Sequence, residues 1–210
     1  MNLKDLKSVI SGGTILIAVI LYLIFADPKD EAEKNPATTN STEQTAETKI
    51  TTDYAMKATG KQLQEVTYVS ANDGDTFTVN VNGEKKKVRL LMIDTPEMNY
   101  NKGEPMPYAE QAKDYTITKL KNAGKIELLL DKGPETDNYD RLLGYVFVDG
   151  ELLQEKLVTE GLAAMRYVNA PNNSLEQEIR DAQKKAEAAK LNIWSIDGYF
   201  ENNRFNEDVQ

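Results

Sequence analysis

Residues 76–93, with the sequence TFTVNVNGEKKKVRLLMI, carry the pattern that decides the fold. Polar and apolar side chains alternate through residues 76–81, and Asn82 and Gly83 follow as a dipeptide typical of a type I′ hairpin turn. Residues 88–93 are apolar at nearly every position, as in a central strand that is buried on both faces. The stretch therefore predicts two antiparallel strands joined by a tight turn.

Similar patterns extend to either side of this hairpin. Three further strands are predicted, at residues 64–70, 125–130 and 142–148. Three helices are predicted, at residues 108–122, 151–160 and 174–190. Ser174 is the expected N-cap of the third helix. Five short strands with peripheral helices predict an α+β fold built on a small closed β-barrel, of the type that binds oligonucleotides or oligosaccharides (the OB-fold).

The composition excludes several kinds of chemistry. The 210 residues include no His and no Cys, so an imidazole base, a thiolate nucleophile and a thiolate-bound zinc are all excluded. The net charge of −9 at pH 7 argues against a simple nucleic-acid binder, which usually carries a basic stripe. A local group of basic residues opposes this trend; it consists of Lys85, Lys86, Lys87, Arg89 and Lys102.

The N-terminal region carries a membrane signal. Residues 9–26 are 18 consecutive uncharged residues, which at about 1.5 Å per residue just span a bilayer core. Lys4 and Lys7 precede them, so the positive-inside rule places the N-terminus in the cytoplasm and the rest of the chain outside. A retained signal anchor is favoured over a cleaved signal peptide. We therefore expect a membrane-anchored protein with an extracellular domain, or a secreted one if the segment is cleaved.

The composition changes along the chain predict four regions. Residues 1–26 form the signal anchor or signal peptide, and residues 27–60, which are rich in Lys, Glu, Thr and Asn, form a disordered linker. Residues 61–196 form the folded domain, and residues 197–210 form a polar and loosely ordered tail. Nothing in these regions calls for a protein partner or for more than a monomer.

Acidic side chains gather at the predicted strand ends. Asp73 and Asp75 flank Gly74, which permits a tight turn, and Asp94 ends the strand after the hairpin. Oxygen-only ligands suit Ca²⁺ or Mg²⁺. Taken alone, the tripeptide favours an ordinary turn over a metal site.

Three further charged residues complete a candidate site for phosphoryl chemistry. Arg89 lies on a largely apolar strand, where a guanidinium needs an anion, either a structural carboxylate or a phosphate. Glu97 lies three residues after Asp94 and is a candidate general base, although it could also be a solvated loop acid. Arg141 is either the second half of an arginine clamp or a surface residue beside Asp137.

Five segments, taken in order and with their spacing, resemble the staphylococcal nuclease (thermonuclease) family. They are Asp73 to Thr76, Arg89 to Glu97, Thr136 to Arg141, Tyr167 with Pro171 to Asn173, and Leu191 to Trp194. The resemblance covers nearly all of residues 61–195. It implies a five-stranded barrel with three helices, and Ca²⁺-dependent hydrolysis of DNA and RNA to 3′-phosphate products.

The resemblance also implies roles for the matching acidic residues. Asp75 and Asp94 would bind one Ca²⁺ ion through their carboxylates, and Thr95 would bind it through its backbone carbonyl, with Asp73 nearby. Glu97 would orient or deprotonate the attacking water.

The substrate contacts implied by the resemblance lie on basic and aromatic residues. Arg89 and Arg141 would bind the scissile phosphate and stabilise charge in the transition state. Tyr139 and Tyr167 would line the nucleotide pocket, and Lys102 is a further candidate for substrate binding.

Three departures from the family pattern concern substrate binding. Asn138 stands where the best-known member has Lys, Asp140 where it has Gly, and Asn169 where it has a second Tyr. Loss of a ring that stacks on a base is expected to weaken binding by ~1–3 kcal/mol. The alternatives to a nuclease are a catalytically weak nucleic-acid-binding OB-fold module and a surface Ca²⁺-binding domain.

Overall fold

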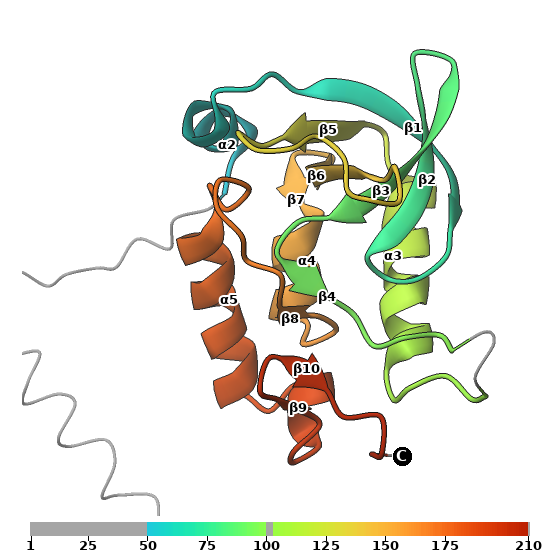
Figure 1. The fold of residues 1–210 in the computed structure, drawn as a ribbon, viewed down its shortest axis with the longest axis vertical. Helices are drawn as coiled ribbons and strands as arrows, with labels where there is room; N and C mark the ends of the chain where they lie inside the picture. Colours follow the sequence, from blue (N-terminus) through green and yellow to red (C-terminus); the bar gives the residue numbers. More distant parts are fainter. Residues whose placement is uncertain (1–49, 100–102, 210) are drawn as a thin grey trace, which may run out of the picture. The chain divides into compact units, whose positions relative to one another are not determined.

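A sheet that closes on itself forms the centre of the fold (Figure 1). The computed structural model describes residues 50–99 and 103–209 of the chain. The strands of this sheet are β1 (Gln64–Ala71), β2 (Thr76–Val81), β3 (Glu84–Leu90), β5 (Ile126–Leu130), β6 (Leu142–Val148) and β7 (Glu151–Leu152). Their order is β3-β2-β1-β5-β6-β7, and an additional pairing between β3 and β6 closes five of them into a barrel. The predicted α+β fold with a five-stranded OB-type barrel is therefore confirmed.

The β2–β3 hairpin forms as the sequence predicts. Asn82 has a φ of 51° and Gly83 a φ of 91°, which are the positive values that a type I′ turn requires at both positions. Phe77 and Val79 are fully buried, because alternate residues of β2 point into the barrel. The hairpin therefore places its polar positions on the outer face.

The third predicted strand differs from the structure at both ends. Strand β3 begins earlier than the predicted segment, at Glu84, and ends at Leu90. Met92 has a φ of 62°, which interrupts the extended backbone. The chain then forms β4 (Ile93–Asp94), which pairs antiparallel with β8 (Ala164–Met165) in a separate sheet. This break moves Asp94 away from the β3 ladder and beside the segment that follows β8.

The helices lie outside the barrel (Figure 1), and one predicted cap is wrong. They are α3 (Ala109–Asn122), α4 (Leu153–Thr159), α5 (Glu176–Ala188) and the short 3₁₀-helix η1 (Asn192–Ser195). The N-cap of α5 is Leu175, which provides no side-chain hydrogen bond. Ser174 instead donates from Oγ to Oδ1 of the buried Asp131 over 2.6 Å. Its hydroxyl thus joins α5 to the end of β5 and does not cap the helix.

A further α-helix lies in the segment that the sequence predicts as linker. Helix α2 (Thr52–Thr59) is capped by Thr51 and ends at Gly60, which has a left-handed φ of 71°. Ile50 and Ala55 are buried in the main hydrophobic core. The predicted linker, residues 27–60, therefore extends too far, because residues 50–60 belong to the folded region. Its remaining part lies outside the described residues.

The C-terminal segment is also part of the folded region, and the expected loosely ordered tail at residues 197–210 is wrong for residues 197–209. Strands β9 (Phe200–Glu201) and β10 (Arg204–Phe205) form a hairpin. Tyr199 is fully buried and donates a 2.6 Å hydrogen bond to the carbonyl of Pro107. Tyr199, Phe200 and Phe205 form a second hydrophobic core with Met98 and Met106, which lie at either end of the loop after Glu97. Three large rings among polar residues are enough to hold the segment in place.

No helix in the part of the chain that the structure describes is long and apolar enough to cross a membrane. The predicted membrane segment, residues 9–26, lies outside that part.

Candidate active site

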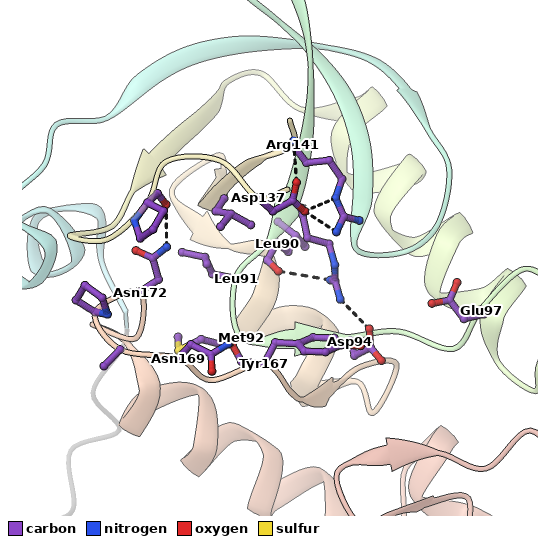
Figure 2. Close-up of a pocket in the computed structure, with 15 residues that line it drawn as sticks. Leu90, Leu91, Met92, Asp94, Glu97, Asp137, Arg141, Tyr167, Asn169 and Asn172 are labelled. Atoms are coloured by element: carbon purple, nitrogen blue, oxygen red, sulfur yellow. Dashed lines mark hydrogen bonds and ion pairs between the residues drawn. The ribbon is translucent and has the colours of Figure 1, made fainter. Parts of the chain in front are cut away.

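A pocket of about 480 Å³ opens beside the ends of β3 and β4 (Figure 2). Its charged and aromatic lining consists of Arg89, Asp94, Glu97, Asp137, Arg141 and Tyr167. Its apolar lining includes Leu90, Leu91, Met92 and Leu143. The pocket therefore offers cations and acids on one side and an apolar surface on the other.

Asp75 is fixed in a buried position by hydrogen bonds. Its Oδ2 accepts from the backbone amide of Thr95 over 2.9 Å and from the Thr95 hydroxyl over 3.2 Å. Its Oδ1 accepts from the hydroxyl of Thr76 over 2.9 Å. The structure thus joins the Asp73–Gly74–Asp75 turn to the Asp94–Thr95 segment, as the site prediction requires.

Gly74 allows this turn to lie directly against helix α3. A Cβ atom on Gly74 would lie 2.9 Å from both Ala112 Cβ and Thr95 Cγ2. Thr116 of α3 donates a 2.6 Å hydrogen bond to the Gly74 carbonyl. The close backbone approach therefore accounts for the glycine between the two acids.

Arg89 lies between the two carboxylates that the sequence assigned to a metal. Its Nη1 is 2.8 Å from Asp75 Oδ2, and its Nη2 is 2.7 Å from Asp94 Oδ1. All three side chains are at least nine-tenths buried. Burial disfavours the charge of Arg89, but Asp75 and Asp94 together raise its pKa. The guanidinium is therefore the counterion of both acids in this structure.

Four acids crowd this end of the barrel. Glu97 is an exposed residue at this end. Partial desolvation of its carboxylate and the charges of Asp75, Asp73 and Asp94 nevertheless raise its pKa to about 7. Desolvation and the charge of Asp75 also raise the pKa of Asp73 and of Asp94. Neighbouring carboxylates repel one another, so these groups do not all ionise easily at once. A bound cation would stabilise their ionised forms.

The oxygen ligands at this end of the barrel suit a hard cation, but Arg89 lies between two of them. Asp75, Asp94 and the carbonyl of Thr95 offer only oxygen atoms, which is the preference of Ca²⁺. Among residues 50–99 and 103–209, no group of three or more acidic side chains is arranged so that it could hold a metal ion. Arg89 contacts one oxygen of each of these two acids, so a bound cation would compete with its guanidinium.

Arg141 is held at the pocket by a neighbouring acid. Its Nε and Nη2 lie 2.7 Å and 2.6 Å from Asp137 Oδ2, as the dashed contacts in Figure 2 show. Asp137 Oδ1 also accepts from the backbone amides of Tyr139 and Arg141. Partial desolvation opposes these contacts, but together they lower the pKa of Asp137. The loop thus orients Arg141 toward the same pocket as Arg89.

The predicted aromatic contacts are only partly brought together. Tyr167 lines the pocket, and the guanidinium carbon of Arg89 lies 5.7 Å from its ring centroid. Tyr139 is 81% exposed and does not line the pocket, although its ring lies 5.5 Å from the guanidinium carbon of Arg141. Lys102 lies outside the described residues.

Arg166 is a site residue that sequence reasoning missed. It follows β8, and its Nη1 donates to Asp94 Oδ2 over 2.8 Å. Its guanidinium also lies 4.6 Å from the ring centroid of Tyr167. The available signal was a charged residue directly after the buried run from Ala163 to Met165, the same kind of signal that identified Arg89.

This chain departs from the family pattern at three positions around the pocket. Asn169 lines the pocket and donates to the Tyr167 carbonyl, so it supports the backbone where a ring is absent. Asn138 and Asp140 are exposed on the loop that carries Arg141. The departures therefore lie at the rim, whereas the inner charged residues are all present.

Comparisons with known proteins agree with this geometry. The family described as "Staphylococcal nuclease homologue" matches residues 87–196. Endonuclease YncB of Bacillus subtilis (strain 168) is 39% identical over 205 residues, which cover 93% of this chain and 97% of the relative. Thermonuclease of Staphylococcus hyicus is 40% identical over 123 residues, which cover 59% of this chain and 71% of the relative.

A second Bacillus subtilis relative is longer than this chain, which matches only half of it. SPbeta prophage-derived endonuclease YokF is 43% identical over 150 residues, which cover 71% of this chain and 50% of that protein. The family match and the names of these relatives support a hydrolase of the nuclease class. With the closed barrel, the acids at its strand ends and the two pocket arginines, they show that the chain belongs to the staphylococcal nuclease family.

Proposed function

We propose that this chain is a Ca²⁺-dependent nuclease that hydrolyses phosphodiester bonds of DNA and RNA and leaves 3′-phosphate ends. The observation that carries the proposal is one pocket lined by Asp94, Glu97, Arg89 and Arg141, with Asp75 buried behind it in an ion pair with Arg89. Acids that hold a cation and arginines that bind a phosphate are the two components that phosphodiester hydrolysis needs.

In this proposal Asp75 and Asp94 hold one Ca²⁺ ion through their carboxylates, together with the backbone carbonyl of Thr95. The bound ion supplies Lewis-acid stabilisation of the phosphate charge. Glu97 lines the pocket beside these acids, and its carboxylate accepts a proton from the attacking water or orients it. Its position on a loop at the edge of the pocket leaves room for water beside the phosphate.

The two arginines stabilise the phosphate as negative charge develops. Arg141 stays oriented by Asp137, and it can share its outer donors with a phosphate oxygen. Arg89 is available to a phosphate when its contacts with Asp75 and Asp94 loosen. Tyr167 and the apolar lining of the pocket contact the nucleotide next to the cleaved bond.

The proposal includes a location and an oligomeric state. The protein acts as a monomer outside the cell, either anchored by residues 9–26 or secreted after cleavage of that segment. The support for this location is the uncharged run with its preceding lysines, and Ca²⁺ is plentiful there. The start of the mature protein, near Met1 or near Asp27, distinguishes the anchored form from the secreted form.

The test is digestion by the full chain followed by analysis of the new ends. Plasmid DNA and RNA should be degraded in millimolar Ca²⁺ and spared when a chelator is added. The products should carry 3′-phosphates. Digestion that persists in chelator, or 5′-phosphate products, would overturn the assigned mechanism.

One observation favours a second candidate, a nucleic-acid-binding module with weak catalysis. Arg89 already forms ion pairs with both Asp75 and Asp94, so a bound cation competes with an internal counterion. Under this alternative a folded protein would retain an oligonucleotide on a filter but would not shorten it in Ca²⁺. Cleavage under the same conditions excludes this alternative.

A further inference from the structure

The outer face of strand β3 carries a row of cations that ends at the pocket. Side chains alternate along a strand, so Lys85, Lys87 and Arg89 point to one face, at steps of about 7 Å. Arg89 lines the pocket, whereas Lys85 and Lys87 are exposed. We refer to Lys85 and Lys87 as the lysine row.

The strands on both sides of β3 leave the lysine row open to a polyanion. On β2, the partners of Lys85 and Lys87 are Asn80 and Thr78, which carry no charge. On the other side, β3 pairs in parallel with β6 at residues 88–90, which follow the two lysines.

The same parallel pairing connects β3 to the strand that follows the second pocket arginine. Arg89 lies opposite Leu143, and Arg141 directly precedes the first residue of β6. Leu143 and Arg141 both line the pocket. The lysine row therefore continues the surface of the two pocket arginines away from the cleavage site.

The lysine row has no counterion of its own. Within residues 50–99 and 103–209, neither Lys85 nor Lys87 forms an ion pair, whereas Lys86 pairs with Glu84 at 3.1 Å. Asp137 pairs with Arg141 and does not neutralise the row. In a chain with a net charge of −9, two unpaired lysines beside a phosphate pocket form a local exception to the general repulsion of nucleic acid.

We propose that the lysine row binds the backbone phosphates of a polynucleotide strand outside the cleavage pocket, so that the enzyme favours long substrates over short ones. The proposal rests on the nuclease function proposed above. The step between the two lysines is comparable to the step between successive phosphates of an extended strand. Such contacts carry no sequence information, but they add affinity that falls with salt.

The test compares a long and a short substrate with the full chain. The double variant Lys85→Gln, Lys87→Gln should lose about tenfold in kcat/KM on an oligonucleotide that reaches past the hairpin, at low salt. It should lose less than twofold on a dinucleotide that fills only the pocket. The matched control is Lys57→Gln, Lys121→Gln, which removes the same charge from exposed positions of α2 and α3. The control should change neither value by more than twofold.

A binding measurement separates this proposal from the proposed function. In chelator, fluorescence anisotropy of a labelled oligonucleotide gives the slope of log K against log salt concentration. The slope of the lysine-row variant should be smaller than that of the native chain by about 1–2, because two phosphate contacts are lost. An unchanged slope, or equal losses on both substrates, would overturn the lysine row as a binding surface. If the native chain binds with the expected slope and cleaves nothing, the proposed function fails and the lysine row stands.

Discussion

Arg166 donates from Nη1 to Oδ2 of Asp94 over 2.8 Å, at the outer edge of the acidic site. The other oxygen of Asp94 is held by Arg89 over 2.7 Å. The β4–β8 pairing brings Arg166 to this position, since Asp94 lies opposite Ala164 in that ladder. One carboxylate is thus oriented by Arg89 of β3 and by Arg166, which directly follows β8.

Arg166→Ala should destabilise the protein through Asp94. The substitution leaves one oxygen of a buried carboxylate without its charged donor, so the free energy of unfolding should fall by about 1–3 kcal/mol. Urea denaturation at neutral pH measures this loss. The matched control is Arg180→Ala, which breaks the more exposed pair with Glu176 and should cost clearly less than Arg166→Ala. Equal losses for the two variants would show that Arg166 does not support Asp94.

Arg89→Ala should make stability depend on Ca²⁺. In chelator the variant leaves Asp75 and Asp94 buried without their shared counterion, which should cost about 3–5 kcal/mol. Added Ca²⁺ should restore part of this loss, because a cation can replace the guanidinium between the two carboxylates. Thermal unfolding with and without Ca²⁺ measures the difference. Arg89→Lys, which keeps the charge, should lose less; a Ca²⁺ effect no larger than in the native chain would contradict the shared site.

Glu97→Gln should reduce turnover without disturbing the fold. Loss of a general base typically lowers kcat by about 10²–10⁴-fold, and the outer side of Glu97 is exposed. Single-turnover cleavage of a labelled oligonucleotide measures the rate. Glu104→Gln, an exposed acid of the same loop, is the control and should cleave at the native rate. Near-native turnover by the Glu97 variant would remove this residue from the mechanism.

Gly74→Ala should damage both the fold and the site. The new methyl group would lie 2.9 Å from Ala112 Cβ and from Thr95 Cγ2, so α3 or the Thr95 segment must move. Overpacking of this kind costs about 1–3 kcal/mol, and movement of Thr95 should also lower kcat. Gly124→Ala, whose new methyl group would meet only the Asp149 carboxylate at 3.2 Å, serves as the control. Denaturation and cleavage assays on both variants should show a loss that is specific to Gly74.

Asp137 should contribute stability that is lost in acid. Its folded-state pKa is lowered, chiefly by the Arg141 and Tyr139 contacts that outweigh partial desolvation. Because the folded state binds a proton less readily than the unfolded state, the contribution is present above the unfolded pKa of about 3.9 and disappears as pH falls through the folded pKa.

The comparison of the native chain with Asp137→Asn measures this dependence. The difference in the free energy of unfolding between the two proteins should be largest near neutral pH and should shrink below about pH 4. Urea titrations across this range supply the values. A difference that grows in acid would show that the sign of the pKa shift is wrong.

The sequence alone determined the elements that depend on local chemistry. Asn82 and Gly83 form the predicted turn because few other residues adopt positive φ at both positions. The alternation in β2 predicted which side chains enter the barrel, and Phe77 and Val79 are indeed buried. The family motifs placed Arg89, Asp94 and Arg141 in one site, and all three line one pocket.

Only the tertiary structure decided which charges neutralise one another and where the folded region ends. The ion pair of Asp94 with Arg166 depends on the β4–β8 pairing, which joins residues far apart in sequence, and the ion pair of Asp75 with Arg89 depends on the β2–β3 pairing. Helix α2 and the C-terminal hairpin were missed because their polar residues resemble a linker and a tail. A few buried side chains, such as Ala55 and Tyr199, hold them through long-range packing that no local pattern contains.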